Sequence, residues 1–314
     1  MSELKKRPVI IDCDPGTDDA ICIFMVLAQD NFDVLGICPV NGNKPLSVCE
    51  VNALRLCELT GRTDIPVLKG ANKGMFREQR DAGNIHGAGG LGEAVLPEPV
   101  KQLEDEYAWD FLYRKAVECG GELEVLAVGP LTNLGIAFTK YPDLKNMIKQ
   151  IVIMGGANGI GNHGTVPAEF NIWVDPEAAK IVFKSGVPCA MMGLDICEAM
   201  PVKNEAINVM RQGGKVSRAA ADMIGKYAGT GRNLVICDAT AACYLIDPSI
   251  INAEHVHVDV ETKGKLTEGK TVITRFWTEH IKIEPNCYVG IDGDIDKFTQ
   301  LVLDSLAKLD AAVE

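Results

Sequence analysis

The segment at residues 9–20, VIIDCDPGTDDA, carries the main signal for the fold. Its first three residues, Val9–Ile11, are apolar and β-branched, which is typical of a strand buried on both faces. Pro15 and Gly16 then form a tight turn, and the apolar pattern that follows predicts a helix over Asp18–Gln29. We therefore predict a strand, a turn and a helix, the kind of unit from which parallel sheets are built.

The same alternation of apolar runs and helical patterns continues along the chain. Further strands are predicted at Val34–Val40, Ile65–Leu68, Leu123–Val128, Ile151–Met154 and Cys189–Leu194, and helices at Leu46–Leu59, Tyr107–Glu118 and Pro176–Lys184. After His255 the pattern becomes β-like, over His257–Glu261, Thr271–Thr274 and Cys287–Ile291, and Phe298–Leu309 closes the chain as a helix. Residues 72–92 are rich in glycine and polar residues and are predicted to be a long loop that could act as a lid. The predicted fold class is α/β, with a doubly wound, mainly parallel central sheet, helices on both faces and a small extra β region near the C-terminus.

Composition limits the class of function. Hydrophobic residues make up 47% of the 314 residues and charged residues 24%, and no linker or repeat is visible, so we expect one domain over residues 1–314. The formal net charge of −12 argues against a surface that binds nucleic-acid phosphates. The 11 cysteines include no C-x-x-C pair, and no apolar run has the length of a signal peptide core or a membrane span. We expect a cytoplasmic enzyme that binds neither membrane nor nucleic acid.

Four carboxylates lie within eight residues: Asp12, Asp14, Asp18 and Asp19. Carboxylates this close repel one another unless a cation lies among them. The Pro15-Gly16 turn can bring Asp14 back toward Asp18 and Asp19 at the carboxyl end of the strand, where ligands bind in such sheets. Oxygen ligands suit a hard cation, Ca²⁺ or Mg²⁺.

Two other interpretations of this cluster stay open. Asp18 and Asp19 could only stabilise the helix N-terminus, which would leave Asp12 and Asp14 unexplained. Asp12 and Asp14 could instead form the Asp-x-Asp motif of a Mg²⁺-dependent phosphatase, with a carboxylate nucleophile. Pro15 and the Asp18–Asp19 pair fit the phosphatase pattern poorly.

Residues 12–20, Asp12-Cys13-Asp14-Pro15-Gly16-Thr17-Asp18-Asp19-Ala20, resemble the signature of the inosine–uridine-preferring nucleoside hydrolase family. Three further segments agree in order and spacing: Val40-Asn41-Gly42-Asn43, Ile153-Met154-Gly155-Gly156, and Ala168-Glu169-Phe170-Asn171 leading into Asp175-Pro176-Glu177-Ala178-Ala179. Cys237-Asp238-Ala239 and Ile246-Asp247-Pro248 are similar to the family's late metal-binding helix. The resemblance spans nearly the whole chain. It implies a Ca²⁺-dependent enzyme that hydrolyses the N-glycosidic bond of ribonucleosides and assembles as a homo-oligomer, a tetramer or a dimer.

The resemblance also implies roles for individual residues. Ca²⁺ would be held by Asp14, Asp19, Asp238 and the backbone carbonyl of Val128. The ribose pocket would be formed by Asp18, Asn43, Asn162, Glu169 and Asn171 around the hydroxyls, together with Met154 and Phe170, while His86 would lie near the nucleobase. Asp14 would be the general base toward a water that Ca²⁺ positions and acidifies, and the ribose would pass through an oxocarbenium-like transition state.

The step that releases the nucleobase is where the sequence departs from the family pattern. The best-known members carry a His directly before the late metal-binding Asp, whereas here Cys237 precedes Asp238. A thiol of ordinary pKa is a poor proton donor beside a metal carboxylate. His86 is one candidate for the leaving-group acid, and a base stack on Tyr227 or Trp277 is another way to release the base. The sequence leaves the base preference open, as it does a non-catalytic protein that binds a nucleoside or Ca²⁺.

Overall fold

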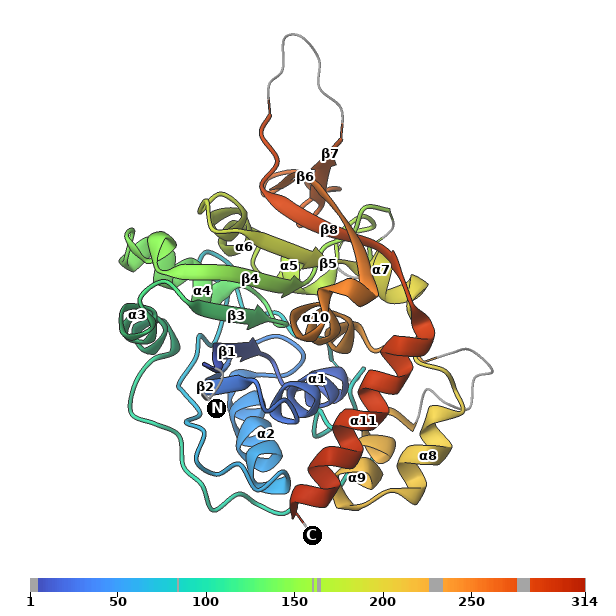
Figure 1. Cartoon of the computed structure of the whole chain (residues 1–314). Helices are drawn as coiled ribbons and strands as arrows, with labels where there is room; N and C mark the ends of the chain where they lie inside the picture. Colours follow the sequence, from blue (N-terminus) through green and yellow to red (C-terminus); the bar gives the residue numbers. More distant parts are fainter. Residues whose placement is uncertain are drawn as a thin grey trace.

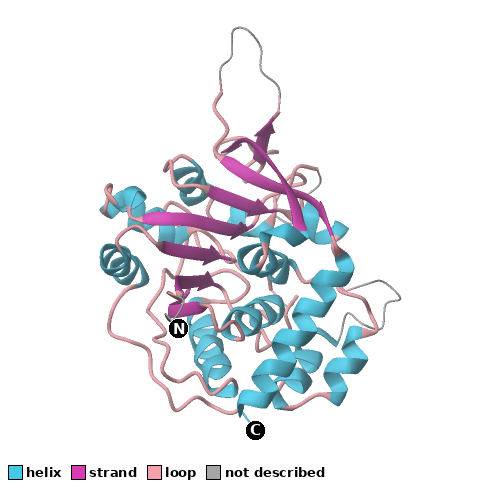
Figure 2. Ribbon diagram, in the orientation of Figure 1, coloured by secondary structure: helices cyan, strands magenta, loops and turns pink. Residues whose placement is uncertain are grey.

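The central feature is a twisted sheet. The computed structural model of the protein describes residues 5–83, 85–159, 161–162, 165–225, 234–275 and 283–313. The strands are β1 (Arg7–Cys13), β2 (Phe32–Pro39), β3 (Leu123–Ala127), β4 (Ile148–Met154), β5 (Cys189–Met192), β6 (Ile251–Val260), β7 (Thr271–Thr274) and β8 (Cys287–Gly293). Within the described residues they form one eight-stranded sheet in the order β2-β1-β3-β4-β5-β8-β6-β7 (Figures 1 and 2). In this order, each strand from β2 through β1, β3, β4 and β5 to β8 pairs in parallel with the next. Strand β6 pairs antiparallel with both β8 and β7.

Helices cover both faces of this sheet (Figure 1). They are α1 (Thr17–Leu27), α2 (Leu46–Leu59), α3 (Ala108–Cys119), α4 (Thr132–Lys140), α5 (Phe170–Val174), α6 (Pro176–Phe183), α7 (Leu194–Ala199), α8 (Ala206–Gln212), α9 (Lys215–Ile224), α10 (Cys237–Ile246) and α11 (Ile295–Val313). Strand β1 shows why its sequence is apolar throughout. Ile11 packs in the core with Phe24 of α1 and Phe298 of α11, whereas Ile10 packs in the opposite core with Phe111 of α3. Both faces of the central strands are therefore removed from water, as the apolar runs predicted.

Most of the predicted elements are confirmed, and α2 has the predicted bounds, Leu46–Leu59. The exception is Ile65–Leu68, which forms no regular strand. Val67 makes a single bridge to Ile37, and Lys69 then pairs with Tyr107, so this segment divides its backbone hydrogen bonds between two partners. The extra β region predicted near the C-terminus is part of the same sheet, because β8 lies directly against β5. Of the helices in the described part of the chain, none combines the length and apolar character that crossing a membrane requires.

The loop predicted at residues 72–92 contains no helix or strand among its described residues. It is nevertheless tied down at several points. Lys44 Nζ donates to the carbonyl of Gly83 at 2.6 Å, and Asn52 Nδ2 donates to the carbonyls of Gly89 and Pro15, both at 3.0 Å. The Arg80 guanidinium lies 4.1 Å from the ring centroid of Trp173. The loop is thereby anchored over the carboxyl ends of the first strands.

Candidate active site

The turn between β1 and α1 is the floor of the candidate site. Asp14 follows the last residue of β1, and Asp19 lies in the first turn of α1; both are fully buried. Asp19 Oδ1 accepts a hydrogen bond from the backbone N–H of Asp14 at 3.1 Å, and Oδ2 accepts one from Gly16 at 2.9 Å. Asp19 therefore closes the Pro15-Gly16 turn, and this turn holds Asp14 and Asp19 side by side.

Asn43, which follows β2, locks this turn from the neighbouring strand. Its backbone N–H donates to Asp14 Oδ2 at 2.6 Å, and its side-chain Nδ2 donates to Asp19 Oδ2 at 2.9 Å. The approach is close enough that a Cβ on Gly42 would lie 2.0 Å from Asp14 Oδ2, so residue 42 must be a glycine. The segment Asn41-Gly42-Asn43 thus forms a turn and also brings the backbone into contact with the Asp14 carboxylate.

Asp238 comes from a distant part of the chain and completes an acidic cluster. It lies in the first turn of α10, which packs beside α1 (Figure 1). Asp18, Asp19 and Asp238 each offer one oxygen, and these three oxygens lie within 4.8 Å of one another. Burial, with repulsion from Asp18 and Asp19 next, raises the pKa of Asp238 well above its ordinary value. Burial first, with repulsion from Asp18 next, raises the pKa of Asp19 to about 6.

The cluster has the character of a cation site. Asp14 Oδ1 and Asp18 Oδ1 are buried and accept no hydrogen bond in the described structure. Buried carboxylate oxygens without donors are costly, and a bound cation would both satisfy them and remove the mutual repulsion. The donors are all oxygens, which fits Ca²⁺ or Mg²⁺. Two of the four predicted ligands, Asp19 and Asp238, thus meet here together with Asp18, and Asp14 lies beside Asp19.

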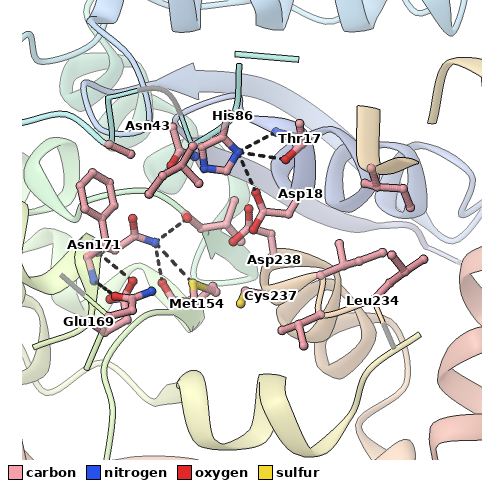
Figure 3. A pocket seen from close by; sticks show the side chains of 18 residues that line it. Thr17, Asp18, Asn43, His86, Met154, Glu169, Asn171, Leu234, Cys237 and Asp238 are labelled. Carbon is pink, nitrogen blue, oxygen red and sulfur yellow. Dashed lines mark hydrogen bonds and ion pairs between the residues drawn. The ribbon is translucent and has the colours of Figure 1, made fainter. Parts of the chain in front are cut away.

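The fourth predicted ligand, the carbonyl of Val128, lies just past the end of β3 and lines the same cavity. It accepts a hydrogen bond from Asn171 Nδ2 at 2.7 Å. A carbonyl oxygen has two lone pairs, so one remains for a second partner. The Asn171 amide also donates to the carbonyl of Met154 at 3.1 Å, which joins the ends of β3 and β4 to α5 (Figure 3).

Glu169 and its neighbours form the opposite wall. The Glu169 side chain caps α5, with Oε1 accepting from the backbone of Asn171 at 2.9 Å and Oε2 from Gly156 at 3.0 Å. Burial raises the pKa of Glu169 to about 7, although these backbone donors lower it. Asn162 Oδ1 accepts a hydrogen bond from the backbone N–H of Phe170 at 3.0 Å, which holds the Asn162 side chain at the same wall. These contacts fix the polar wall in a single arrangement.

A cavity of about 270 Å³ lies between these walls (Figure 3). Ten of the twelve predicted site residues line it, namely Asp18, Asn43, His86, Val128, Met154, Asn162, Glu169, Phe170, Asn171 and Asp238. Asp14 and Asp19 lie directly behind it and are fully buried. Sequence reasoning missed the other lining residues, which are Thr17, Ala82, Ile85, Ile224, Leu234, Val235, Ile236 and, as a wall residue, Cys237.

His86, a candidate for release of the nucleobase, and Cys237, judged a poor one, can both be located. His86 Nδ1 lies 2.9 Å from Thr17 Oγ1 and 3.7 Å from Asp18 Oδ1 (Figure 3). Cys237 lines the cavity, and a hydrogen bond with the Cys197 thiol, followed by burial, raises its pKa well above the ordinary value. The Cys237 thiol therefore stays protonated and is a weak acid. Tyr227 and Trp277 lie outside the described residues.

Comparison with known proteins identifies the family. The family model described as inosine-uridine preferring nucleoside hydrolase matches residues 9–300. The chain belongs to this family. Curated relatives of this nucleoside hydrolase include the pyrimidine-specific ribonucleoside hydrolase RihA of Shewanella woodyi, 38% identical over 310 residues, which cover 96% of this chain and 98% of the relative. RihA of Escherichia coli K12 is 38% identical over 309 residues, covering 95% and 98%.

Solved structures agree with the family assignment. A purine-preferring ribonucleoside hydrolase from Gardnerella vaginalis matches this nucleoside hydrolase with a TM-score of 0.90 at 28% identity, over 97% of this chain and 99% of that chain. The plant nucleoside hydrolase PpNRh1 matches with a TM-score of 0.87 at 30% identity, over 96% and 99%. The protein is thus an enzyme that hydrolyses N-glycosyl bonds of ribonucleosides. This family assignment sets aside both the phosphatase and the non-catalytic binding protein.

Proposed function

We propose that this nucleoside hydrolase is Ca²⁺-dependent, uses Asp14 as its general base, and acts preferentially on pyrimidine ribonucleosides. The observation that most supports this proposal is the convergence of one oxygen each from Asp18, Asp19 and Asp238 within 4.8 Å beside the cavity. In addition, Asp14 Oδ1 and Asp18 Oδ1 accept no hydrogen bond in the described structure. The resemblance of the sequence to the family also suggests a homo-oligomer in nucleoside salvage. Eleven free cysteines suit the reducing cytoplasm.

The residues that would hold Ca²⁺ are Asp14, Asp19, Asp238 and the carbonyl of Val128. When bound, Ca²⁺ neutralises the carboxylates and lowers the pKa of the attacking water. Asp14 suits the role of proton acceptor because its two oxygens differ. Oδ2 is held by the backbone N–H of Asn43, while Oδ1 has no hydrogen-bond donor among the described residues. Oδ1 can therefore take a proton without breaking a hydrogen bond of the fold.

The polar wall would hold the ribose and stabilise its developing positive charge. Glu169 and Asn171 are fixed by backbone contacts, so they need no rearrangement when that charge develops. Glu169 Oε2 accepts from the backbone of both Gly156 and Ile172, whereas Oε1 accepts from Asn171 and keeps a lone pair that can accept a hydrogen bond from a ribose hydroxyl. Asp18, Asn43 and Asn162 would complete the ring of oxygen atoms around the sugar.

The remaining wall would contact the nucleobase. Ile85, Ile224, Leu234 and Ile236 line it and offer an apolar surface to a flat ring. The cavity, at about 270 Å³, is at or below the lower end of the roughly 300–1,000 Å³ usual for ligand sites. A small cavity suits the smaller pyrimidine ring, and the RihA relatives carry the name pyrimidine-specific.

A steady-state panel tests this function. Uridine, cytidine, inosine, adenosine and guanosine are each supplied with Ca²⁺, and free ribose is measured as reducing sugar. We expect uridine and cytidine to give the highest kcat/KM, with release of free base and no phosphate requirement. Equal or higher rates with purines would reject the pyrimidine preference. Flat traces with all five nucleosides would reject the proposed substrate class. Light scattering in the same buffer reports whether the enzyme is a dimer or a tetramer.

A further inference from the structure

His86 meets the N-terminus of α1 through one ring nitrogen. Thr17 is the first residue of α1, so its backbone N–H has no partner inside the helix. This N–H donates to Nδ1 of His86 at 3.3 Å, and Thr17 Oγ1 lies 2.9 Å from the same nitrogen. A backbone N–H can only donate a hydrogen bond, so Nδ1 is the acceptor and carries no proton. In a neutral imidazole the proton then belongs to Nε2.

We propose that Thr17 is a positioning residue that holds His86 as the neutral tautomer with its proton on Nε2. His86 lines the cavity, and Nε2 makes no hydrogen bond within the described part of the chain. The ring therefore offers the substrate an uncharged N–H donor. This inference rests on the hydrolysis of pyrimidine ribonucleosides proposed above, and it assigns His86 a task different from that of an imidazolium acid.

The position of the His86 ring is fixed by the turn before α1 on one side and by its own loop on the other. A Cβ on Gly16 would lie 2.8 Å from His86 Nδ1, so only glycine allows the ring to approach the helix. On the side of the loop, the backbone carbonyl of His86 accepts from Gly92 at 3.0 Å. Asn52 joins the two segments, since its Nδ2 donates to the carbonyls of Pro15 and Gly89. The turn and the loop are thus joined directly beside the ring.

The carboxylates of Asp18 and Asp19 oppose the neutral ring. Asp18 Oδ1 lies 3.7 Å from Nδ1 and would attract a protonated imidazole. A proton on Nδ1 would, however, face the Thr17 N–H across 3.3 Å and would remove its acceptor. The positive end of the α1 dipole also disfavours a cation at this position. The Thr17 N–H therefore orients Nδ1 as an acceptor although a carboxylate lies near.

The neutral donor gives a complete account of the electrons and protons in the reaction. The bond between ribose C1′ and the base nitrogen breaks, and its electron pair goes to the base. The water oxygen bonds to C1′, and Asp14 takes the proton that the water loses. His86 Nε2–H donates a hydrogen bond to an acceptor of the base that gains negative charge, such as the carbonyl oxygen beside the glycosidic nitrogen of a pyrimidine. The base leaves as an anion and takes its proton from solvent.

The direct test is a two-bond ¹⁵N–¹H NMR spectrum of the intact enzyme labelled with ¹⁵N-histidine. The chain has 5 histidines, and His86 is assigned from the signals absent in the His86→Gln variant. At neutral pH we expect an unprotonated Nδ1 and a protonated Nε2. A proton on Nδ1, or protons on both nitrogens, would overturn the inference. The spectrum needs no substrate, so it gives its answer even if the panel of ribonucleosides rejects the proposed function.

Variants separate the backbone N–H from the hydroxyl. Thr17→Ser and Thr17→Ala keep the N–H and should keep the tautomer. Thr17→Pro removes the N–H at a position where helices accept proline, and it should shift the tautomer populations toward Nδ1–H. If Thr17→Pro does not fold, the spectrum of the unaltered enzyme still decides. An unchanged tautomer in folded Thr17→Pro would show that Thr17 does not position the ring.

Steady-state kinetics with uridine provide a further test of the neutral donor. The amide nitrogen of glutamine can reach the place of Nε2, whereas that of asparagine reaches only the place of Nδ1. We expect His86→Gln to retain a kcat about tenfold or more above that of His86→Asn, since only the former keeps a donor aimed at the substrate. Equal kcat values for the two variants in an active enzyme would reject the neutral donor.

Discussion

The two ends of the cavity are formed by different kinds of residue. The metal end, formed by Asp14, Asp18, Asp19, Asn43 and Asp238, is dense in charge and is held by hydrogen bonds to backbone groups at strand ends. The base end is formed by apolar side chains from a loop and from the ends of helices, including Ile85, Ile224, Leu234 and Ile236. The first arrangement fixes atoms in place for chemistry, whereas the second supplies a shape. Substitutions at the two ends should therefore fail in different ways.

The relatives illustrate this difference. Proteins with TM-scores of 0.90 and 0.87 to this chain are described as purine-preferring and as an inosine-guanosine hydrolase. Other relatives are described as pyrimidine-specific. One fold thus accommodates several base preferences, which is expected if selectivity comes from a wall of apolar side chains that can change without disturbing the acidic cluster.

The largest effect is expected from Asp14→Ala. Loss of the general base should lower kcat for uridine by about 10³-fold, with a much smaller change in KM. The matched control is Asp33→Asn, which alters an exposed aspartate on β2 and should leave kcat unchanged. Circular dichroism must show that both variants are folded. A near-normal kcat in Asp14→Ala would place the base elsewhere and would break the assignment of chemistry to the metal end.

Removal of Ca²⁺ comes next. A strong chelator should lower kcat on the order of 100-fold, because several kcal/mol of transition-state stabilisation are lost. Saturating Ca²⁺ at roughly 100 times its Kd should also stabilise the fold by about 2.7 kcal/mol, which scanning fluorimetry detects as a higher Tm. In Asp238→Asn this rise in Tm should be smaller. Full activity after exhaustive chelation, confirmed by elemental analysis, would reject the metal dependence.

The acidic cluster also predicts how the stability of the metal-free protein depends on pH. Burial raises the pKa of Asp19 to about 6 and that of Glu169 to about 7, so the folded state binds more protons than the unfolded state above the ordinary carboxylate pKa. Stability should then fall as the pH rises from about 4.5 toward 7. We expect the chelated enzyme to melt at a higher temperature at pH 5.5 than at pH 7.5. Ca²⁺ should reduce the difference, and an opposite slope in the metal-free protein would contradict the buried cluster.

A smaller effect, of a different kind, is expected at the base end. Leu234 is buried and lines the cavity, so Leu234→Ala should enlarge the space for the base. We expect the ratio of kcat/KM for uridine to that for inosine to fall about tenfold, within the range that lost apolar contacts produce. The Ca²⁺-induced rise in Tm should be unchanged. A variant that lost the Ca²⁺ response but kept its base preference would show that the two ends are not independent.

The two ends also differ in how far the sequence predicts them. The acidic cluster was predictable because carboxylates cannot cluster at a strand end without a cause, and because Asp238 follows a segment that resembles the family pattern. Ile224 and Leu234 could not be predicted, because an apolar residue that lines a cavity has the same sequence pattern as one in the core. Thr17 was also missed, since its contact with His86 depends on the path of the loop and not on local sequence.

The fold shows the same limit. The apolar runs of β1 and β3 predicted buried parallel strands, since Val9–Ile11 is uninterrupted and Glu124 is the only polar residue within Leu123–Val128. The segment Ile65–Leu68 has an equally suitable sequence, yet it forms only one bridge, from Val67 to Ile37. Its hydrogen bonds are divided between Ile37 of β2 and Glu104, which is far away in the chain, so the outcome is set by tertiary contacts that local propensity does not contain.

The smallest effect is expected from Cys237→Ala, on the border between the two ends. The position directly before Asp238 is where the best-known relatives carry a histidine, so an acid at this place would make the substitution costly. The Cys237 thiol has a raised pKa, first because of the hydrogen bond with Cys197 and then because of burial, so it is a weak acid toward the leaving base. We expect kcat for uridine to change by less than about threefold, far below the 10²–10⁴-fold that a general acid contributes. The measurement is kcat across pH 6–9 for the unaltered enzyme and for Cys237→Ala, with Cys243→Ala, a buried thiol of the same helix, as the control for packing. A loss of about 100-fold confined to Cys237→Ala would make the thiol the proton donor, and the base end would then take part in the chemistry as well as in selection.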